Sequence, residues 1–127
     1  MSDDSRALFE RLGGASSLKA ILDDFYLRVL KDAELAPFFA EVSLERLRNM
    51  QFHFMASAFG GPVEYSGAEL TAIHAHRGIK STHFAKFCSL FADVLEDHSV
   101  GQREVDDVLG RLAMYKDRIT GDATVDG

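Results

Sequence analysis

The strongest constraint on the fold is a helical repeat of apolar side chains along long segments of the chain. In these segments the apolar residues recur every three or four positions, which places them on one face of an α-helix. The segments run over residues 17–31, 43–59, 81–95 and 102–119. No stretch of five or more residues alternates between polar and apolar side chains, as a half-buried strand would. The sequence therefore predicts an all-α fold.

The residues at the ends of these segments are suited to starting and stopping helices. Ser16 or Ser17 is predicted to cap the first long helix, and Ser43 is predicted to cap the second. The run Gly60–Gly61–Pro62 is predicted to stop the second helix, because it combines glycine with a residue that lacks an N–H. Shorter elements are expected between the long helices: a leading helix over 5–11, a tight connector over 35–39, and a loop over 62–80 with one helical turn at 70–74.

Length and charge restrict the class of protein and its partners. The 127 residues fit a single domain over 1–127, with about 120–127 as a flexible tail. With 20 acidic and 14 basic residues the net charge is −6, which argues against nucleic acid and anionic membranes as partners. The acidic, polar start is unlike a signal peptide, and no apolar run reaches the roughly 20 residues that span a bilayer. We therefore expect a cytoplasmic protein, and we expect it to be a monomer.

The single cysteine and the acidic clusters do not suggest a catalytic site. Cys88 excludes an internal disulfide, agrees with a reducing compartment, and lies on an apolar helical face where a packing role is expected. The pairs Asp23–Asp24 and Asp106–Asp107 fall on polar helical faces, where we expect them to face solvent.

The spacing of the histidines argues against zinc and leaves haem open. None of the five histidines lies three or four residues from another, as a two-histidine zinc face on a helix requires. A single neutral imidazole is sufficient, however, where a macrocycle supplies the other ligands of an iron atom. His74 is the best candidate on local grounds, because it closes a short apolar turn directly before the helix-stopping Arg77–Gly78. Spacing alone leaves open that His74 is an ordinary exposed or hydrogen-bonded histidine.

Two polar side chains fall on the apolar faces of neighbouring predicted helices. Gln51 lies within the inward stripe of the second long helix, and Tyr26 lies on the inward face of the first. A buried amide without a partner costs roughly 1–3 kcal/mol, so each group needs one. The two could bind a small polar ligand together, or they could satisfy each other or a water molecule. His53 falls on the outer side of the second helix and is expected to be solvated.

Taken in order, these motifs resemble the truncated haemoglobins, and the resemblance is closest to the first group of that family. It covers about residues 9–119 and rests on the following runs: Leu12–Gly14, Asp24–Leu30, Pro37–Phe39, Gln51, Gly60–Pro62 and His74–Ile79. The resemblance implies a globin-like two-over-two helical sandwich around haem b, which we expect to be bound non-covalently.

The resemblance also implies roles for individual residues. His74 matches the proximal iron ligand, Tyr26 the distal tyrosine that stabilises O2, and Gln51 the distal amide that assists it. Some relatives place a histidine or lysine at the position of Met50 as a second axial ligand, so this chain is expected to leave the iron open to a gas. The residues expected to contact the haem are Phe39, Leu47, Met50, Phe54, Met55, Ile79 and Phe84.

The resemblance leaves several functions open. The first is reversible binding of O2, with NO and CO as further ligands. The second is NO dioxygenation, which converts NO and O2 to nitrate and needs a reductase. A haem sensor or redox protein, and a helical domain that has lost its haem, are the remaining alternatives.

Overall fold

The structure is a computed structural model that describes residues 7–40, 43–61 and 79–116. All regular elements within these residues are helical, which confirms the predicted all-α class. They are α1 (Leu8–Arg11), α2 (Gly14–Val29), the 3-10 helix η2 (Ala36–Phe39), α3 (Leu44–Ala58), α5 (Ser81–Asp97) and α6 (Gln102–Ala113). The helical turn predicted at 70–74 and the predicted end of the last helix at 119 lie outside the described residues.

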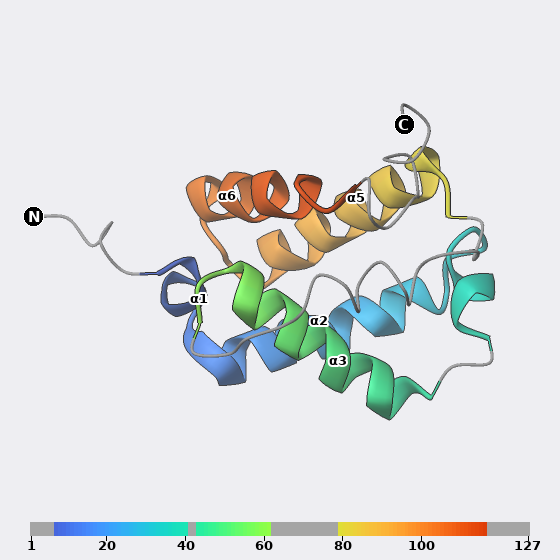
Figure 1. Cartoon of the computed structure of the whole chain (residues 1–127), viewed down its shortest axis with the longest axis horizontal. Coiled ribbons are helices and arrows are strands. Elements are labelled where there is room, and N and C mark those ends of the chain that lie inside the picture. The colour runs from blue at the N-terminus through green and yellow to red at the C-terminus, as the bar shows by residue number, and fades with distance from the viewer. Residues whose placement is uncertain (1–6, 41–42, 62–78, 117–127) are drawn as a thin grey trace, which may run out of the picture.

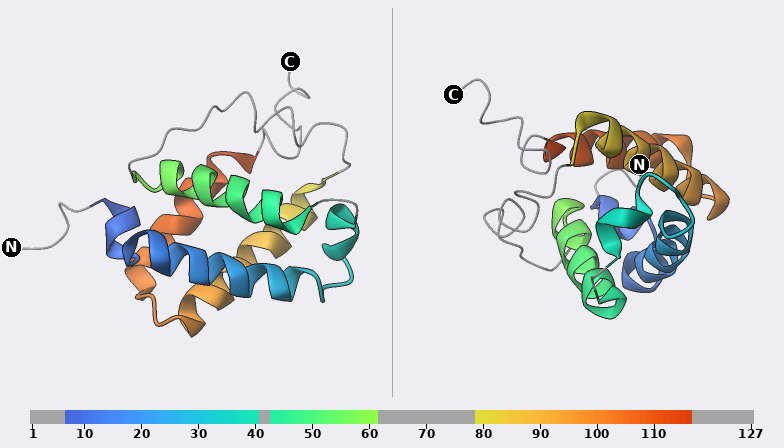
Figure 2. Two further views of the ribbon diagram at one scale, coloured as in Figure 1. Left: turned by 90° about the horizontal axis from the view of Figure 1, so that it is seen from below. Right: turned by 90° about the vertical axis from the view of Figure 1, so that its right-hand side faces the viewer.

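The four long helices form two layers of two, as the predicted sandwich requires. Helices α2 and α3 make one layer, and α5 and α6 make the other (Figure 1). The end-on view in Figure 2 shows the two pairs stacked on each other. Helix α2 packs against both α3 and α5, while the short α1 packs against α2 and α6. A side chain on the inner face of α2 therefore lies at the centre of the sandwich.

Aromatic side chains join α2 to α5 in the core. The Phe25 ring is fully buried, and its centroid lies 4.8 Å from the Phe87 ring and 5.1 Å from the Phe91 ring, both in edge-to-face geometry. Leu30 continues the apolar face of this helix in the sequence, which predicts that it is buried, but it lies just beyond the last turn and is 38% exposed. Within the part of the chain that the structure describes, no helix combines the length and apolar composition that a membrane span requires.

The predicted start of the first long helix is also wrong. Helix α2 begins at Gly14, so Ser16 and Ser17 lie inside its first turn instead of capping it. Gly13 is the residue before the helix and has a φ of +107°, in the left-handed region. A Cβ at this position would also collide with the Ser17 hydroxyl. Backbone conformation at a glycine, rather than a hydroxyl cap, therefore decides where α2 starts.

Both ends of α3 agree with the prediction. The Ser43 hydroxyl caps the helix and accepts a hydrogen bond from the Arg46 N–H at 3.4 Å. At the other end the Gly61 N–H donates to the carbonyl oxygen of Ala56 at 2.7 Å, and Gly60 has a φ of +83°. This is the geometry by which glycine satisfies the last carbonyl groups of a helix.

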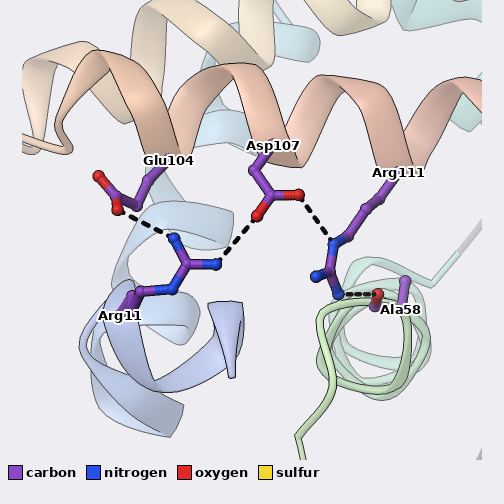
Figure 3. Close-up of polar contacts among 5 residues, drawn as sticks. All are labelled: Arg11, Ala58, Glu104, Asp107 and Arg111. Carbon is purple, nitrogen blue, oxygen red and sulfur yellow. Dashed lines mark hydrogen bonds and ion pairs between the residues drawn. The ribbon is translucent and has the colours of Figure 1, made fainter. Parts of the chain in front are cut away.

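A polar network, which we call the α6 network, ties α1 and α3 to α6 (Figure 3). Arg11 donates to Glu104 and to Asp107, each at 3.0 Å. Arg111 donates to Asp107 at 3.0 Å and to the carbonyl oxygen of Ala58, near the end of α3, at 3.1 Å. The expectation that Asp107 faces solvent is therefore wrong, because the carboxylate bridges two guanidinium groups. Burial acts to raise the pKa of Asp107, but the hydrogen bonds from Arg11 and Arg111 outweigh it and lower the pKa.

Candidate functional site

Tyr26 is the central residue of the candidate site. Its side chain is 2% exposed, and its ring meets the Phe25 ring at 5.2 Å and the Phe39 ring at 5.8 Å, both edge to face. The hydroxyl is buried and has no hydrogen-bond partner among the described residues. Burial raises the pKa of this phenol far above its ordinary value of 10, so the group stays neutral and can donate a hydrogen bond.

Gln51 is the only buried polar residue that the structure describes, and like Tyr26 it has a buried polar atom without a hydrogen-bond partner. The residue is 9% exposed, and its Oε1 atom is buried without a hydrogen-bond partner among the described residues. The predicted burial of Tyr26 and Gln51 is therefore confirmed. The alternative that the two side chains satisfy each other is not what the structure shows. Each orphaned group costs roughly 1–3 kcal/mol relative to a paired one, so Tyr26 and Gln51 are candidates for contact with a ligand.

The remaining residues expected to line the site come from three elements. Leu47, Phe54 and Met55 are buried on α3, and Phe84 is buried on α5. Met50 is half-buried on α3, and Ile79 is half-buried just before α5. Phe39 is half-buried in η2, where its ring meets Tyr26. His74 lies outside the described residues, so its role as an iron ligand stays a prediction.

Three histidines within the described residues are engaged elsewhere. His53 is exposed, as predicted, and its Nδ1 lies 2.8 Å from the carbonyl oxygen of Asn49. His83 Nδ1 accepts a hydrogen bond from the Lys80 N–H at 3.0 Å and closes the first turn of α5. His98 Nε2 lies 3.1 Å from Asp24 Oδ2, so the expectation that Asp24 simply faces solvent is wrong. His83 was missed in the sequence, although its place three residues after a helix start is the signal for such a cap.

Cys88 fits the packing role expected for it. The thiol belongs to a half-buried residue on α5 that packs against the core, and burial raises its pKa to about 11. A neutral thiol of this kind is a poor nucleophile at neutral pH.

Comparison with known proteins identifies the family and agrees with the fold. The sequence matches the family described as bacterial-like globin over residues 7–121. It is 36% identical to the group 1 truncated haemoglobin GlbN of Mycolicibacterium paratuberculosis over 92% of this chain and 87% of that protein. The fold is that of the truncated haemoglobin of Tetrahymena pyriformis in its Fe(III) form, with a TM-score of 0.85, 24% identity, and coverage of 90% of this chain and 97% of that one.

A further solved structure is the 2/2 haemoglobin of Synechococcus sp. PCC 7002 with covalently attached haem. It matches with a TM-score of 0.85 and 25% identity, and covers 91% of this chain and 99% of that one. An all-α sandwich with these matches defines a globin. More narrowly, the chain belongs to the group 1 truncated haemoglobins and is a haem-binding truncated globin with the 2/2 fold.

Proposed function

We propose that this protein reversibly binds O2, and also NO and CO, at a haem b that is held by His74. In this proposal Tyr26 and Gln51 donate hydrogen bonds to the bound gas. The observation that carries the proposal is the orphaned Tyr26 hydroxyl, which is a hydrogen-bond donor; the orphaned Gln51 Oε1 only accepts, so Gln51 would donate to a gas through its NH2 group. The two residues lie on α2 and α3, which pack against each other. Two buried polar groups with unused hydrogen-bonding capacity are what a small polar ligand between these helices would need.

The residues present fit a haem with one open coordination position. Haem, when bound, would supply an iron atom that can bind a diatomic gas, and His74 would be the protein's ligand to that iron. Phe39, Leu47 and Met55 would supply apolar surface against the macrocycle. Met50 stands where a histidine or lysine would compete for the iron, and its thioether is a much weaker competitor for this position.

Tyr26 and Gln51 then determine how long the gas stays. The Tyr26 O–H donates toward the gas ligand, and the Gln51 amide, which carries both a carbonyl and an NH2, can donate as well. Both groups act in a dry environment, where a hydrogen bond is electrostatically stronger than in water. Gas ligands that draw negative charge onto their outer atom gain most from such donors, so O2 should gain more than CO.

We further propose that the haem is not linked covalently to His98. His98 lies at the end of α5 and is paired with Asp24 on the neighbouring helix, so its Nε2 atom is engaged there. Extraction of the haem into acidified organic solvent would test this, because a covalent link would leave the haem on the protein.

The first experiment is an absorption spectrum of the haem-supplemented protein, with dithionite and with CO. A Soret band that shifts with CO, and is lost or altered in His74→Ala, is the expected result. His53→Ala is the matched control, because it removes an exposed histidine from α3 and should leave the spectrum unchanged. A wild-type protein without a Soret band would overturn the proposal, as would a ferrous spectrum with two strong axial ligands.

A kinetic measurement separates reversible binding from NO dioxygenation. The oxygenated protein is mixed with NO in the presence of a reductant, and nitrate is measured. Slow, stoichiometric conversion agrees with a binding protein. Rapid catalytic turnover would assign the dioxygenase function instead, and would direct the search toward a reductase partner.

A further inference from the structure

The connector between α2 and α3 carries Phe39 but has little structure of its own. None of the four residues of η2 is buried, and its closing hydrogen bond, from the Ala40 N–H to the carbonyl oxygen of Pro37, is long at 3.4 Å. A single turn of 3-10 helix is a weak element. The position of the Phe39 ring against Tyr26 must therefore be set by contacts from outside the connector.

Asp32 makes the first of these contacts, with Lys86 of α5. Its side chain is 13% exposed, although it lies in a surface connection. Oδ1 accepts hydrogen bonds from the N–H groups of Glu34 at 2.9 Å and Leu35 at 3.1 Å, which fixes the turn that leads into η2. Oδ2 lies 3.1 Å from the Nζ atom of Lys86 on α5, and the same Nζ atom lies 2.7 Å from the carboxylate of Glu34, which is also in the connector. One carboxylate therefore shapes the connector and binds it to a helix of the other layer.

An aromatic contact reinforces this attachment one turn earlier on α5. The Phe38 ring meets the His83 ring edge to face at 4.8 Å. His83 is itself held by the hydrogen bond from the Lys80 N–H, so it offers Phe38 a fixed surface. Lys86 follows His83 by three residues and so lies on the same face of α5. The connector is thus attached to α5 at two neighbouring points.

We propose that the Asp32–Lys86 ion pair positions the Tyr26 hydroxyl by holding the connector, and with it the Phe39 ring, against the Tyr26 ring. The ring of Tyr26 makes two aromatic edge contacts, with Phe25 within α2 and with Phe39. Loss of the Phe39 contact removes one of the two, and the direction of the hydroxyl follows the ring. Asp32 and Lys86 are positioning residues in this account, which rests on the gas-binding function proposed above.

The test is a kinetic double-mutant cycle on the haem-loaded ferrous protein. Asp32→Asn keeps an oxygen that can accept from Glu34 and Leu35, but it removes the charge that faces Lys86. Lys86→Met removes this ion pair and the one with Glu34 from the α5 side, and leaves the turn intact. Each variant should release O2 about two- to fivefold faster, the factor that a partly exposed ion pair provides. Asp106→Asn is the matched control, because it makes the same substitution at an exposed site on α6.

The cycle distinguishes a positioning role from a general loss of stability. If Asp32 and Lys86 act through Tyr26, neither substitution should speed O2 release further once Tyr26 is replaced by Phe. A second readout is backbone amide exchange of the CO-bound protein. The N–H groups of Phe38 and Ala40 should exchange several-fold faster in both variants than in wild type. Their exchange rates should be unchanged in Asp106→Asn.

The outcomes separate this inference from the proposed function. If Tyr26→Phe releases O2 as slowly as wild type, the proposed role of Tyr26 fails and the inference fails with it. If Tyr26→Phe speeds release but Asp32→Asn and Lys86→Met do not, only the inference is overturned. Equal acceleration by Lys86→Met in the wild-type and Tyr26→Phe backgrounds would also overturn it, because the ion pair would then act independently of the hydroxyl.

Discussion

Replacing Tyr26 by Phe should change the stability of the gas-free protein and its hold on O2 in opposite directions. The substitution removes one hydroxyl group and keeps the ring, with its contacts to Phe25 and Phe39. That hydroxyl is buried and has no hydrogen-bond partner within the described residues. With a gas present, it is the proposed donor.

The magnitudes follow from the state of that one group. A buried hydroxyl without a partner costs roughly 1–3 kcal/mol, so its removal should raise the free energy of unfolding of the gas-free protein by about 1 kcal/mol or more. For a chain of this size that is a rise of a few degrees in the melting temperature. Loss of a hydrogen bond worth about 1.5 kcal/mol should speed O2 dissociation by about tenfold.

Both quantities can be measured on the same preparation. Urea unfolding of the ferrous protein without oxygen, followed by circular dichroism, gives the stability, and stopped-flow mixing with a scavenger gives the O2 dissociation rate. Tyr115→Phe is the control, because Tyr115 is half-buried and its ring also meets an aromatic partner, Phe54, at 4.9 Å. A Tyr26→Phe protein that is less stable without gas would refute the reasoning, since it would show that the hydroxyl already has a partner.

Two further predictions concern stability. Asp107→Asn should lower the free energy of unfolding by about 1–2 kcal/mol at neutral pH, because it removes both ion pairs of the carboxylate with arginines. Folding lowers the pKa of Asp107, so this contribution to stability is present above the ordinary pKa of 3.8 and is lost as the pH falls through the lower pKa of the folded protein. In urea unfolding at a series of pH values, the difference in free energy of unfolding between Asp107→Asn and wild type should therefore shrink in acid. Gly61→Ala should lower the free energy of unfolding by about 1–3 kcal/mol, since its Cβ would lie 2.8 Å from Phe9. Gly110→Ala on α6 has nothing within 4 Å of its Cβ and should raise the free energy of unfolding by about 0.5–1 kcal/mol. Thermal unfolding measures both changes, and equal effects would contradict the argument.

The helices could be predicted because their signals are local. Apolar periodicity located α3, α5 and the start of α6 closely, and Ser43 and Gly60–Gly61 marked both ends of α3. The start of α2 was missed because it depends on the backbone of Gly13, and a sequence does not show a positive φ. Asp107 was misplaced for a different reason: its partners Arg11 and Arg111 come from two helices, and only the packing brings them together.

Some features of the candidate site could likewise be predicted from the sequence, and others could not. Tyr26 and Gln51 stood out as polar residues on apolar faces, and periodicity was sufficient to predict their burial. That their polar atoms lack partners is a property of the packed structure and could not be predicted. The attachment of the connector was missed altogether, because Asp32 and Lys86 are ordinary surface residues in sequence and meet only across the two layers.

The distribution of satisfied and unsatisfied polar groups separates the parts of this molecule that hold the fold from those available for function. At the α6 network every charged side chain in Figure 3 is paired, and Arg111 also donates to a carbonyl oxygen near the end of α3. At Tyr26 and Gln51 two buried atoms are left without one. Stability alone would not favour such groups, because an apolar residue of similar shape would cost less. The sign of the change in the free energy of unfolding therefore distinguishes the two kinds of residue. Removing a charge from the α6 network should destabilise the fold, whereas removing the Tyr26 hydroxyl should stabilise it and weaken the binding of O2.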